Sequence, residues 1–250
     1  NLTDANKEYL QKYLDVTKSQ MFFAKGIVFV EGISEAILLP EIAKILDRPL
    51  EKYAVELVNV DSVAFSPFVN LFSSHNVQTC FSKVAIVTDD DRCTKKSETN
   101  YINKDFDYDD VNSDISGKLL SGTPSERCNE LETSCRAVGI NVFKATKTLE
   151  YALCCDENNI EYFIEAIKSE YSQLGPALEQ KVNSLHDMNE KAACVWLFIR
   201  AREKCKGAIA QYISQIIKKQ CEMRKRGENI EKEFVIPDYL KEAVYCVTER

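Results

Sequence analysis

The sequence predicts an α/β fold, with a parallel sheet of about four strands flanked by helices and a C-terminal helical subdomain. Up to residue 144, short apolar runs rich in β-branched residues alternate with amphipathic segments, which is the pattern of β-α-β units. From Thr148 onward the apolar period is 3.6 and no strand is predicted. Two apolar runs, 26–31 and 83–88, lead into carboxylates rather than ordinary turn residues.

Local signals set the bounds of the predicted elements. Pro40 lies inside one apolar pattern and predicts a kink or a late helix start. Pro67 stands near the start of the next helix, and Thr123–Glu126 is a capping box whose helix ends at Gly139. The predicted strands are 26–31, 55–60, 83–88 and 140–144, and the predicted helices are 3–22, 34–46, 65–74, 124–138, 157–172, 176–186, 189–204, 207–225 and 237–248. The polar stretch 92–121 is too long for an ordinary connection, so we expect either a mobile loop or an insertion.

Composition narrows the class of protein. The chain has 250 residues and a net charge of −7, and no apolar run approaches the length of a membrane span. Its ten cysteines form no C-x-x-C pair and are accompanied by only two histidines, so we do not expect a zinc site. We interpret the cysteines as reduced thiols, several of them core fillers, in a cytoplasmic protein.

One segment departs from the acidic balance. Residues 200–226 contain nine basic and two acidic residues, a local charge of +7 that leaves −14 for the rest of the chain. A basic stripe of this kind can follow a phosphate backbone, and a solvated helix face is the alternative. The candidate nucleic-acid contacts are Lys218, Lys219 and Arg224.

Acidic residues follow two predicted strands. The first strand ends in Glu31, with Glu35 four residues further on, and Asp89 and Asp91 come after the third strand. Because ligands bind at the carboxyl ends of strands in an open α/β sheet, these side chains predict a concentrated negative site. Such a site favours hard divalent cations and phosphate chemistry. Taken singly, Glu35 could instead favour a helix N-terminus, and 89–91 could form a capping turn.

These residues, in this order, resemble the Toprim domain, and their surroundings resemble the nucleases of the OLD family (overcoming lysogenization defect). The resemblance runs from Phe22 to Val247. Its motifs are Val30–Pro40, Val58–Phe65, Val87–Arg92, Thr148–Tyr151 and Lys206–Ala210. It implies a Toprim-type, Rossmann-like catalytic domain at 23–152 with an insertion near 92–121, preceded by a helix at 1–22 that links to a missing ATPase domain, and followed by a helical subdomain at 153–250.

The family implies a DNA endonuclease that hydrolyses phosphodiesters with two Mg²⁺ or Mn²⁺ ions. We expect Asp89 as the central or shared ligand. Asp91 and Glu31 would complete the first metal, and Glu35 faces the same edge. Glu150 would close the second metal, and Thr88 would add a hydroxyl or backbone contact. Lys206 matches the catalytic lysine of the late K-G-x-x-A motif and is preferred over Lys204 because Gly207 follows it. Glu150 as a helix cap and Lys206 as a surface lysine are the alternatives.

Partners and rival functions follow from the same resemblance. We expect the chain to be part of a longer protein with a covalently linked N-terminal ATPase domain, DNA as substrate, a possible homodimer and no membrane. The setting would be phage–host conflict or DNA processing. The rivals are a non-catalytic Toprim interaction module and another Toprim phosphoryl-transfer enzyme, topoisomerase-like or primase-like.

Overall fold

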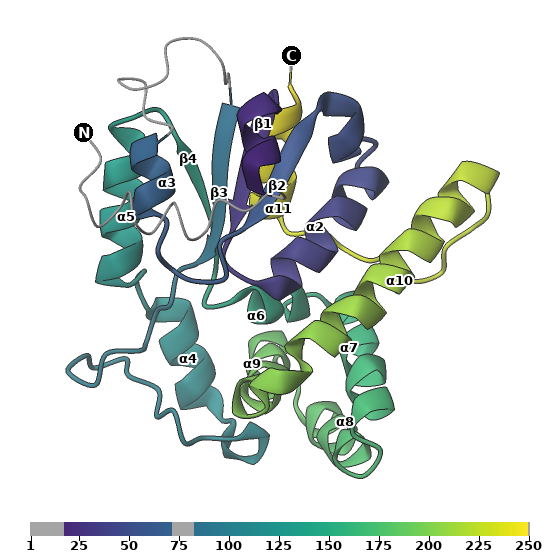
Figure 1. Cartoon of the computed structure of the whole chain (residues 1–250). Helices are drawn as coiled ribbons and strands as arrows, with labels where there is room; N and C mark the ends of the chain where they lie inside the picture. The colour runs from purple at the N-terminus through teal and green to yellow at the C-terminus, as the bar shows by residue number, and fades with distance from the viewer. Residues whose placement is uncertain (1–17, 72–82, 250) are drawn as a thin grey trace. The chain divides into compact units, whose positions relative to one another are not determined.

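The computed structural model describes residues 18–71 and 83–249, and these form two compact units (Figure 1). Unit 1 comprises 18–71, 83–88, 126–144 and 238–249; unit 2 comprises 89–125 and 145–237. Most of the predicted helix 3–22 and the end of the predicted helix 65–74 lie outside the described residues. The described part of the first segment forms a short 3-10 helix, η1 (Lys18–Phe23).

The sheet has four strands in the order β2-β1-β3-β4, which confirms the predicted fold class. The central strand β1 pairs in parallel with β2, from Gly26↔Val55 to Val30↔Asn59, and with β3, from Gly26↔Lys83 to Val30↔Val87. The strands are β1 (Gly26–Val30), β2 (Val55–Asn59), β3 (Lys83–Asp89) and β4 (Asn141–Ala145). All four coincide with predicted strands to within one residue at either end.

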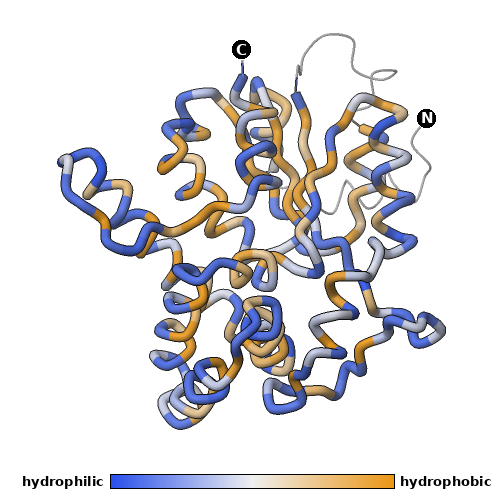
Figure 2. Tube along the Cα trace, turned by 180° about the vertical axis from the view of Figure 1, so that it is seen from behind, coloured by the Kyte–Doolittle hydropathy of each residue, from blue (hydrophilic) through white to orange (hydrophobic). Residues whose placement is uncertain are grey.

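Both faces of the sheet in unit 1 are covered (Figure 1). All five residues of β1 are buried, as expected for a parallel strand packed on two sides, and the strands stand out as apolar in Figure 2. On one face, Ile27 and Phe29 join a core with Phe65 and Phe68. Helices α3 and α5 lie on that side, and α2 and α11 lie on the other. The helices are α2 (Ile33–Ile45), α3 (Ser66–Leu71), α5 (Glu126–Arg136) and α11 (Asp238–Thr248).

Helix α11 packs against β1 and α2, although we predicted it as part of the C-terminal helical subdomain. A side chain at Gly26 would place its Cβ 2.9 Å from the backbone oxygen of Val247, so the first residue of β1 must be small for α11 to approach. The compact units are therefore discontinuous in sequence, and the predicted continuous domain ranges stay predictions.

Helix α2 is continuous through Pro40, so the predicted late start is wrong. The helix begins directly after Gly32, whose extended backbone serves as the N-cap without a side-chain hydrogen bond. Its buried face includes Leu38, Leu39 and Ile42. This packing offsets the hydrogen bond that a proline removes from a helix interior.

Unit 2 is a group of helices around α9, which contacts α4, α6, α7 and α8. Helix α10 packs on α7, and its C-terminal part extends beyond the other helices of unit 2 (Figure 1). The helices are α4 (Ser113–Ser121), α6 (Leu149–Cys154), α7 (Glu157–Glu170), α8 (Leu174–Ser184), α9 (Met188–Ala201) and α10 (Lys206–Arg226). The predicted helix 189–204 instead ends at Ala201, and a 3-10 turn, η4 (Glu203–Cys205), precedes α10.

The stretch 92–121 contains helical segments. It contains η3 (Tyr108–Asp110) and α4, both in contact with α9. Ile102, Tyr108 and Leu119 are buried. The guanidinium of Arg200 donates to the backbone oxygens of two residues in the stretch, at 2.8 and 3.0 Å. These contacts favour the alternative of a packed insertion.

The cysteines of the described residues behave as core fillers. Seven of the nine are buried, and all nine are free thiols. Burial raises the pKa of Cys135 and of Cys194 to about 12. Such thiols stay protonated at neutral pH and are poor nucleophiles.

One ion pair joins the insertion to Arg202, the C-cap residue of α9, and makes the packing of the insertion testable. Arg202 donates to both carboxylate oxygens of Asp107 at 2.8 Å, and its guanidinium lies 3.9 Å from the centre of the Phe198 ring. Burial alone raises the pKa of Asp107, but hydrogen bonds from Arg202 and from the Tyr108 amide, with the charges of Arg202 and Arg200, outweigh it. The pKa of Asp107 therefore lies below its usual value.

We predict that Asp107→Asn lowers the melting temperature of the chain at pH 7 by about 2–4 °C, which corresponds to about 1 kcal/mol. Because the folded-state pKa is depressed, the stabilisation is present above the unfolded-state pKa of about 3.9 and is lost as pH falls through the folded-state value. Thermal unfolding followed by circular dichroism from pH 7 to pH 4 and below should show the difference shrinking. The control Asp114→Asn, in an exposed pair with Lys118, should cost less. An equal cost in the two variants would contradict the packed insertion.

Candidate functional site

In unit 1 the site begins where β1 and β3 end side by side. Register pairs Val30 with Val87, so Glu31 and Thr88 follow at the same level. The Thr88 hydroxyl donates to Oε2 of Glu31 at 2.5 Å. Arg127, in the first turn of α5, places Nη2 3.8 Å from the same oxygen. Thr88 is buried and Glu31 is partly exposed, so one carboxylate faces outward from a fixed strand end.

Glu35 lies one turn into α2 and is 7% exposed. Its Oε2 lies 3.4 Å from the position that a Cβ on Gly32 would occupy, so the carboxylate points back toward the start of the helix. This orientation places Glu35 toward the carboxyl end of β1, where the sequence predicts it. It also suits the favourable interaction of an acid with a helix N-terminus, so both interpretations fit the geometry.

In unit 2, Asp89 is the last residue of β3, and Asp91 lies just beyond the strand. Asp89 accepts a hydrogen bond from the Leu149 amide at 2.9 Å. The backbone of Asp91 is left-handed, with φ of 51°, and its amide donates to the Lys147 carbonyl at 3.4 Å. The turn is thus hydrogen-bonded to the segment that leads into α6. The capping and turn chemistry proposed as an alternative is present at these positions, together with the two carboxylates.

Glu150 and Lys206 come together in unit 2. Lys206 is the first residue of α10, and its Nζ lies 4.0 Å from Oε1 of Glu150. The Glu150 side chain is 8% exposed and stands in the first turn of α6. The N-cap of α6 is Thr148, whose hydroxyl accepts from the Tyr151 amide, so Glu150 is not the capping side chain. Lys204 lies in η4 with an exposed side chain.

Two residues beside the predicted ligands were not singled out from the sequence. Asp90, the middle residue of the D-x-D motif, is 2% exposed and pairs with Arg92 at 2.6 Å. Lys147 is 5% exposed, and its ammonium donates to the Arg92 carbonyl at 2.7 Å. Burial lowers the pKa of Lys147, while the nearby Asp91, Cys93 and Asp89 act in the opposite direction. The sequence signal for each is its position: Asp90 lies inside the D-x-D motif, and Lys147 directly precedes the Thr148–Tyr151 motif.

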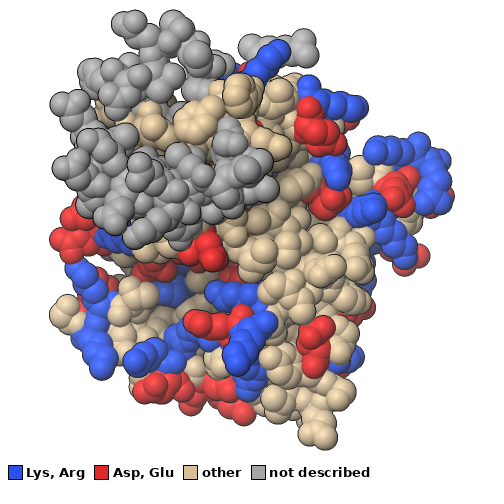
Figure 3. Space-filling model, viewed as in Figure 1, with Lys and Arg blue, Asp and Glu red and all other residues tan. Residues whose placement is uncertain are grey.

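Acidic side chains neutralise part of the basic charge in segment 200–226. Lys218 and Lys219 are exposed on α10, opposite the buried Ile213 and Ile217. Arg224 pairs with Glu233, with Nη2 2.7 Å from Oε1. Figure 3 shows basic and acidic side chains mixed at the projecting end of α10. Within this segment, Lys218 and Lys219 are the better candidates for phosphate contacts.

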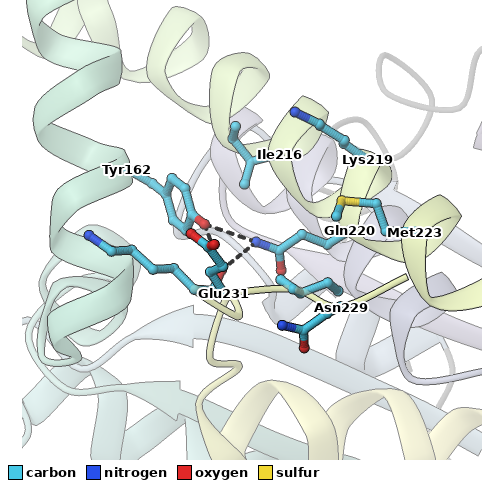
Figure 4. Close-up of a pocket in the computed structure, with 9 residues that line it drawn as sticks. Tyr162, Ile216, Lys219, Gln220, Met223, Asn229 and Glu231 are labelled. Carbon is cyan, nitrogen blue, oxygen red and sulfur yellow. Dashed lines mark hydrogen bonds between the residues drawn. The ribbon is translucent and has the colours of Figure 1, made fainter. Parts of the chain in front are cut away.

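Beside these lysines, α10 and the chain that follows it form a pocket of about 430 Å³. Gln220 is 4% exposed; its amide nitrogen donates to the Tyr162 hydroxyl at 3.1 Å and to the Lys232 carbonyl at 2.9 Å (Figure 4). Its oxygen accepts from the Phe234 amide at 2.8 Å. These bonds attach the returning segment to α10, so we interpret the polar groups of the pocket as structural.

The predicted ligands suit a hard cation by type, because carboxylate oxygens are what Mg²⁺ and Mn²⁺ prefer. Within 18–71 and 83–249, no three His, Cys, Asp or Glu side chains form a ready group that could hold a metal ion. What the structure establishes is local: a fixed Glu31 in unit 1, and in unit 2 a hydrogen-bonded Asp89–Asp91 turn and a Glu150–Lys206 pair.

A parallel sheet with an acidic residue after β1 and a D-x-D turn at the end of β3 defines a Toprim-type α/β protein. Comparison with known families agrees. Residues 22–91 match the family described as overcoming lysogenization defect protein-like, TOPRIM domain. Over these residues the chain is similar to that family, and the predicted resemblance is confirmed. The match supports a phosphoryl-transfer function of the Toprim type.

Solved structures share the fold over most of the chain. The C-terminal region of the Xanthomonas campestris pv. campestris OLD protein is 20% identical, with a TM-score of 0.54, and the match covers 92% of this chain and 95% of that one. The C-terminal region of the Burkholderia pseudomallei OLD protein is 21% identical, with a TM-score of 0.52, covering 90% and 98%. No curated protein sequence matches significantly. None of the helices in the described ranges is long and apolar enough to cross a membrane.

The charge pattern of α10 gives a prediction about DNA binding. Replacing both Lys218 and Lys219 by Gln should weaken binding to duplex DNA of any sequence. The slope of log K against log salt should fall by about 0.9 per lost phosphate contact, or about 2 in all. Arg224→Gln should change the slope less, because Glu233 already neutralises Arg224. Fluorescence anisotropy at several salt concentrations measures these slopes.

The matched control is Lys241→Gln, which removes a lysine from α11 in unit 1. Its slope should equal that of the parent. A slope unaffected by loss of Lys218 and Lys219 would make the basic segment a solvated helix face.

Proposed function

We propose that this chain is the nuclease part of an OLD-type protein, a divalent-metal-dependent endonuclease that hydrolyses phosphodiesters in DNA. The observation that carries the proposal is the OLD-like Toprim match over the segment that ends in Asp89–Asp91. Its support is the placement of oxygen ligands at strand ends, with Glu31 fixed by Thr88 and Asp89 fixed by the Leu149 amide.

The residues that would hold the ions are all carboxylates. We assign Asp89 as the shared or central ligand, with Asp91 and Glu31 completing the first ion and Glu150 closing the second, while Glu35 faces the same edge. Bound ions of this class activate water on one side of the phosphorus and stabilise the leaving oxygen on the other. Mg²⁺ or Mn²⁺ fits such a set of hard oxygen donors.

The remaining groups position ligands or bind the substrate. The Thr88 hydroxyl orients Glu31, because it donates to one oxygen of the carboxylate. The Lys206 ammonium stands beside Glu150 with a side chain that is 35% exposed, so it can reach a phosphate while its stem stays packed. A fixed positive charge there would stabilise negative charge that develops on the phosphate oxygens.

We extend the proposal to partners by analogy with the family. Both structural relatives are, by their names, C-terminal regions of OLD proteins. We propose that this chain likewise works with a covalently linked N-terminal ATPase domain, as a homodimer, in the cytoplasm and in phage–host conflict. Those features lie outside the described residues.

Metal-dependent cutting tests the ligand assignment. The chain should nick supercoiled plasmid with Mg²⁺ or Mn²⁺ and should be inert in chelator. Asp89→Asn keeps an oxygen that accepts from the Leu149 amide but removes the charge. We expect it to lose more than about 100-fold in rate, since changes outside the ligand shell alone cost about 10–100-fold.

Asp114→Asn is the matched control, because Asp114 is an exposed acid of the same unit and pairs with Lys118, one turn further along its own helix. It should cut like the parent. Full activity in Asp89→Asn would refute the ligand assignment, and relaxation with religation instead of stable nicks would favour a topoisomerase-like enzyme.

A second test separates the two neighbouring lysines. Lys206→Ala should keep DNA binding but lose about 10²–10³ in cutting rate, as expected for a preorganised charge that acts on the transition state. Lys204→Ala should cut nearly normally, because Lys204 lies in the preceding turn and is exposed. Single-turnover nicking at saturating metal gives both rates. If Lys204→Ala were slow and Lys206→Ala normal, the catalytic lysine would be Lys204. If both variants cut at the parent rate, neither lysine would act in catalysis.

A further inference from the structure

The buried carboxylate of Asp90 is the centre of a hydrogen-bonded bracket within unit 2. Its Oδ1 accepts from the backbone amides of Lys147, at 2.9 Å, and of Arg92, at 3.1 Å. Its Oδ2 accepts from the Arg92 guanidinium, at 2.9 Å from Nε and 2.6 Å from Nη2. Asp90 therefore has no exposed lone pair to offer a metal, and its role must be exerted through neighbouring residues.

Lys147 closes the bracket from the other side. Its ammonium donates to the Arg92 carbonyl at 2.7 Å and lies 5.3 Å from the centre of the Trp196 ring. The guanidinium of Arg200 lies 4.7 Å from the centre of the same ring. A buried lysine costs free energy unless its charge is compensated, and here the Arg92 carbonyl and the indole ring face the ammonium.

Hydrogen bonds of backbone amides around Asp90 hold the predicted ligands in place. The Asp90 amide donates to the Ala145 carbonyl at 3.1 Å, and the Leu149 amide donates to the Asp89 carboxylate at 2.9 Å. Glu150 is the next residue after Leu149. Asp91 and Lys147 both have left-handed backbones, with φ of 51° and 65°. Aspartate adopts that conformation readily as a single residue, but lysine does so rarely, so the surroundings hold Lys147 there.

We propose that Asp90 and Lys147 are positioning residues that set the metal affinity of the site, by holding Asp89 and Asp91 in register with Glu150. The inference rests on the proposed function, because it concerns the same carboxylates. It adds that the middle residue of the D-x-D motif and a buried lysine decide how tightly the ions are held, although neither touches an ion.

The test is Mn²⁺ binding to the whole chain by isothermal titration calorimetry, without DNA. Lys147→Met keeps the length of the side chain but removes the charge, and Asp90→Asn keeps an acceptor for the amides but loses the ion pair with Arg92. Each should weaken Mn²⁺ binding by about 10–100-fold while circular dichroism stays that of the parent. Lys147→Arg, which can still donate to the Arg92 carbonyl, should recover most of the affinity. Saturating Mn²⁺ should restore the cutting rate of Lys147→Met, because the defect is in affinity.

The controls separate positioning from general stability. Lys118→Met removes the surface partner of Asp114 and should leave Mn²⁺ affinity unchanged. If Lys147→Met does not fold, Asp90→Asn decides the question. Folded variants that bind Mn²⁺ like the parent would overturn the inference, and so would equal losses in Lys147→Arg and Lys147→Met. A parent that binds no Mn²⁺ would instead refute the proposed function itself.

Discussion

Repulsion between carboxylates is the constraint on which this structure depends, because several acids stand at strand and helix ends. Each unit places hydrogen-bond donors or cations beside its own carboxylates. In unit 1 the Thr88 hydroxyl and Arg127 lie beside Glu31. In unit 2 Arg92 pairs with Asp90, and Lys206 lies beside Glu150. Close like charges cannot all remain ionised without counter-charge, so these cations allow the acids to persist where bound metal would later neutralise them.

Much of the fold could be predicted because local patterns specify it. The β-branched runs and their order gave the four strands, and apolar periodicity gave the long helices. Two short helices were not predicted: α4 is nine residues long with Gly117 inside it, and α6 has only six residues. Periodicity also says which face of a helix is apolar but not what covers it. That is why α11 was predicted beside the C-terminal helices although it packs on β1.

The site was predictable as a set of residue types but not as a set of contacts. Carboxylates after apolar strands point to metal chemistry. A sequence cannot show, however, that the Asp90 side chain is buried whereas Asp89 and Asp91 are only partly buried. Lys147 is likewise one lysine among many until its burial against Trp196 is seen. At α10, a count of charges in the sequence overestimates the basic charge that could bind DNA, because Glu233 forms an ion pair with Arg224.

The central claim is that carboxylates at the ends of β1 and β3 bind divalent metal for phosphodiester hydrolysis. A crystal structure of the chain grown with Mn²⁺, with data collected for anomalous scattering from manganese, tests it most directly. We expect anomalous peaks against the carboxylates of Asp89 and Asp91, with Glu31, Glu35 or Glu150 completing the ligands. Well-ordered Asp89 and Asp91 side chains without a manganese peak, at Mn²⁺ concentrations that support cutting, would contradict the claim.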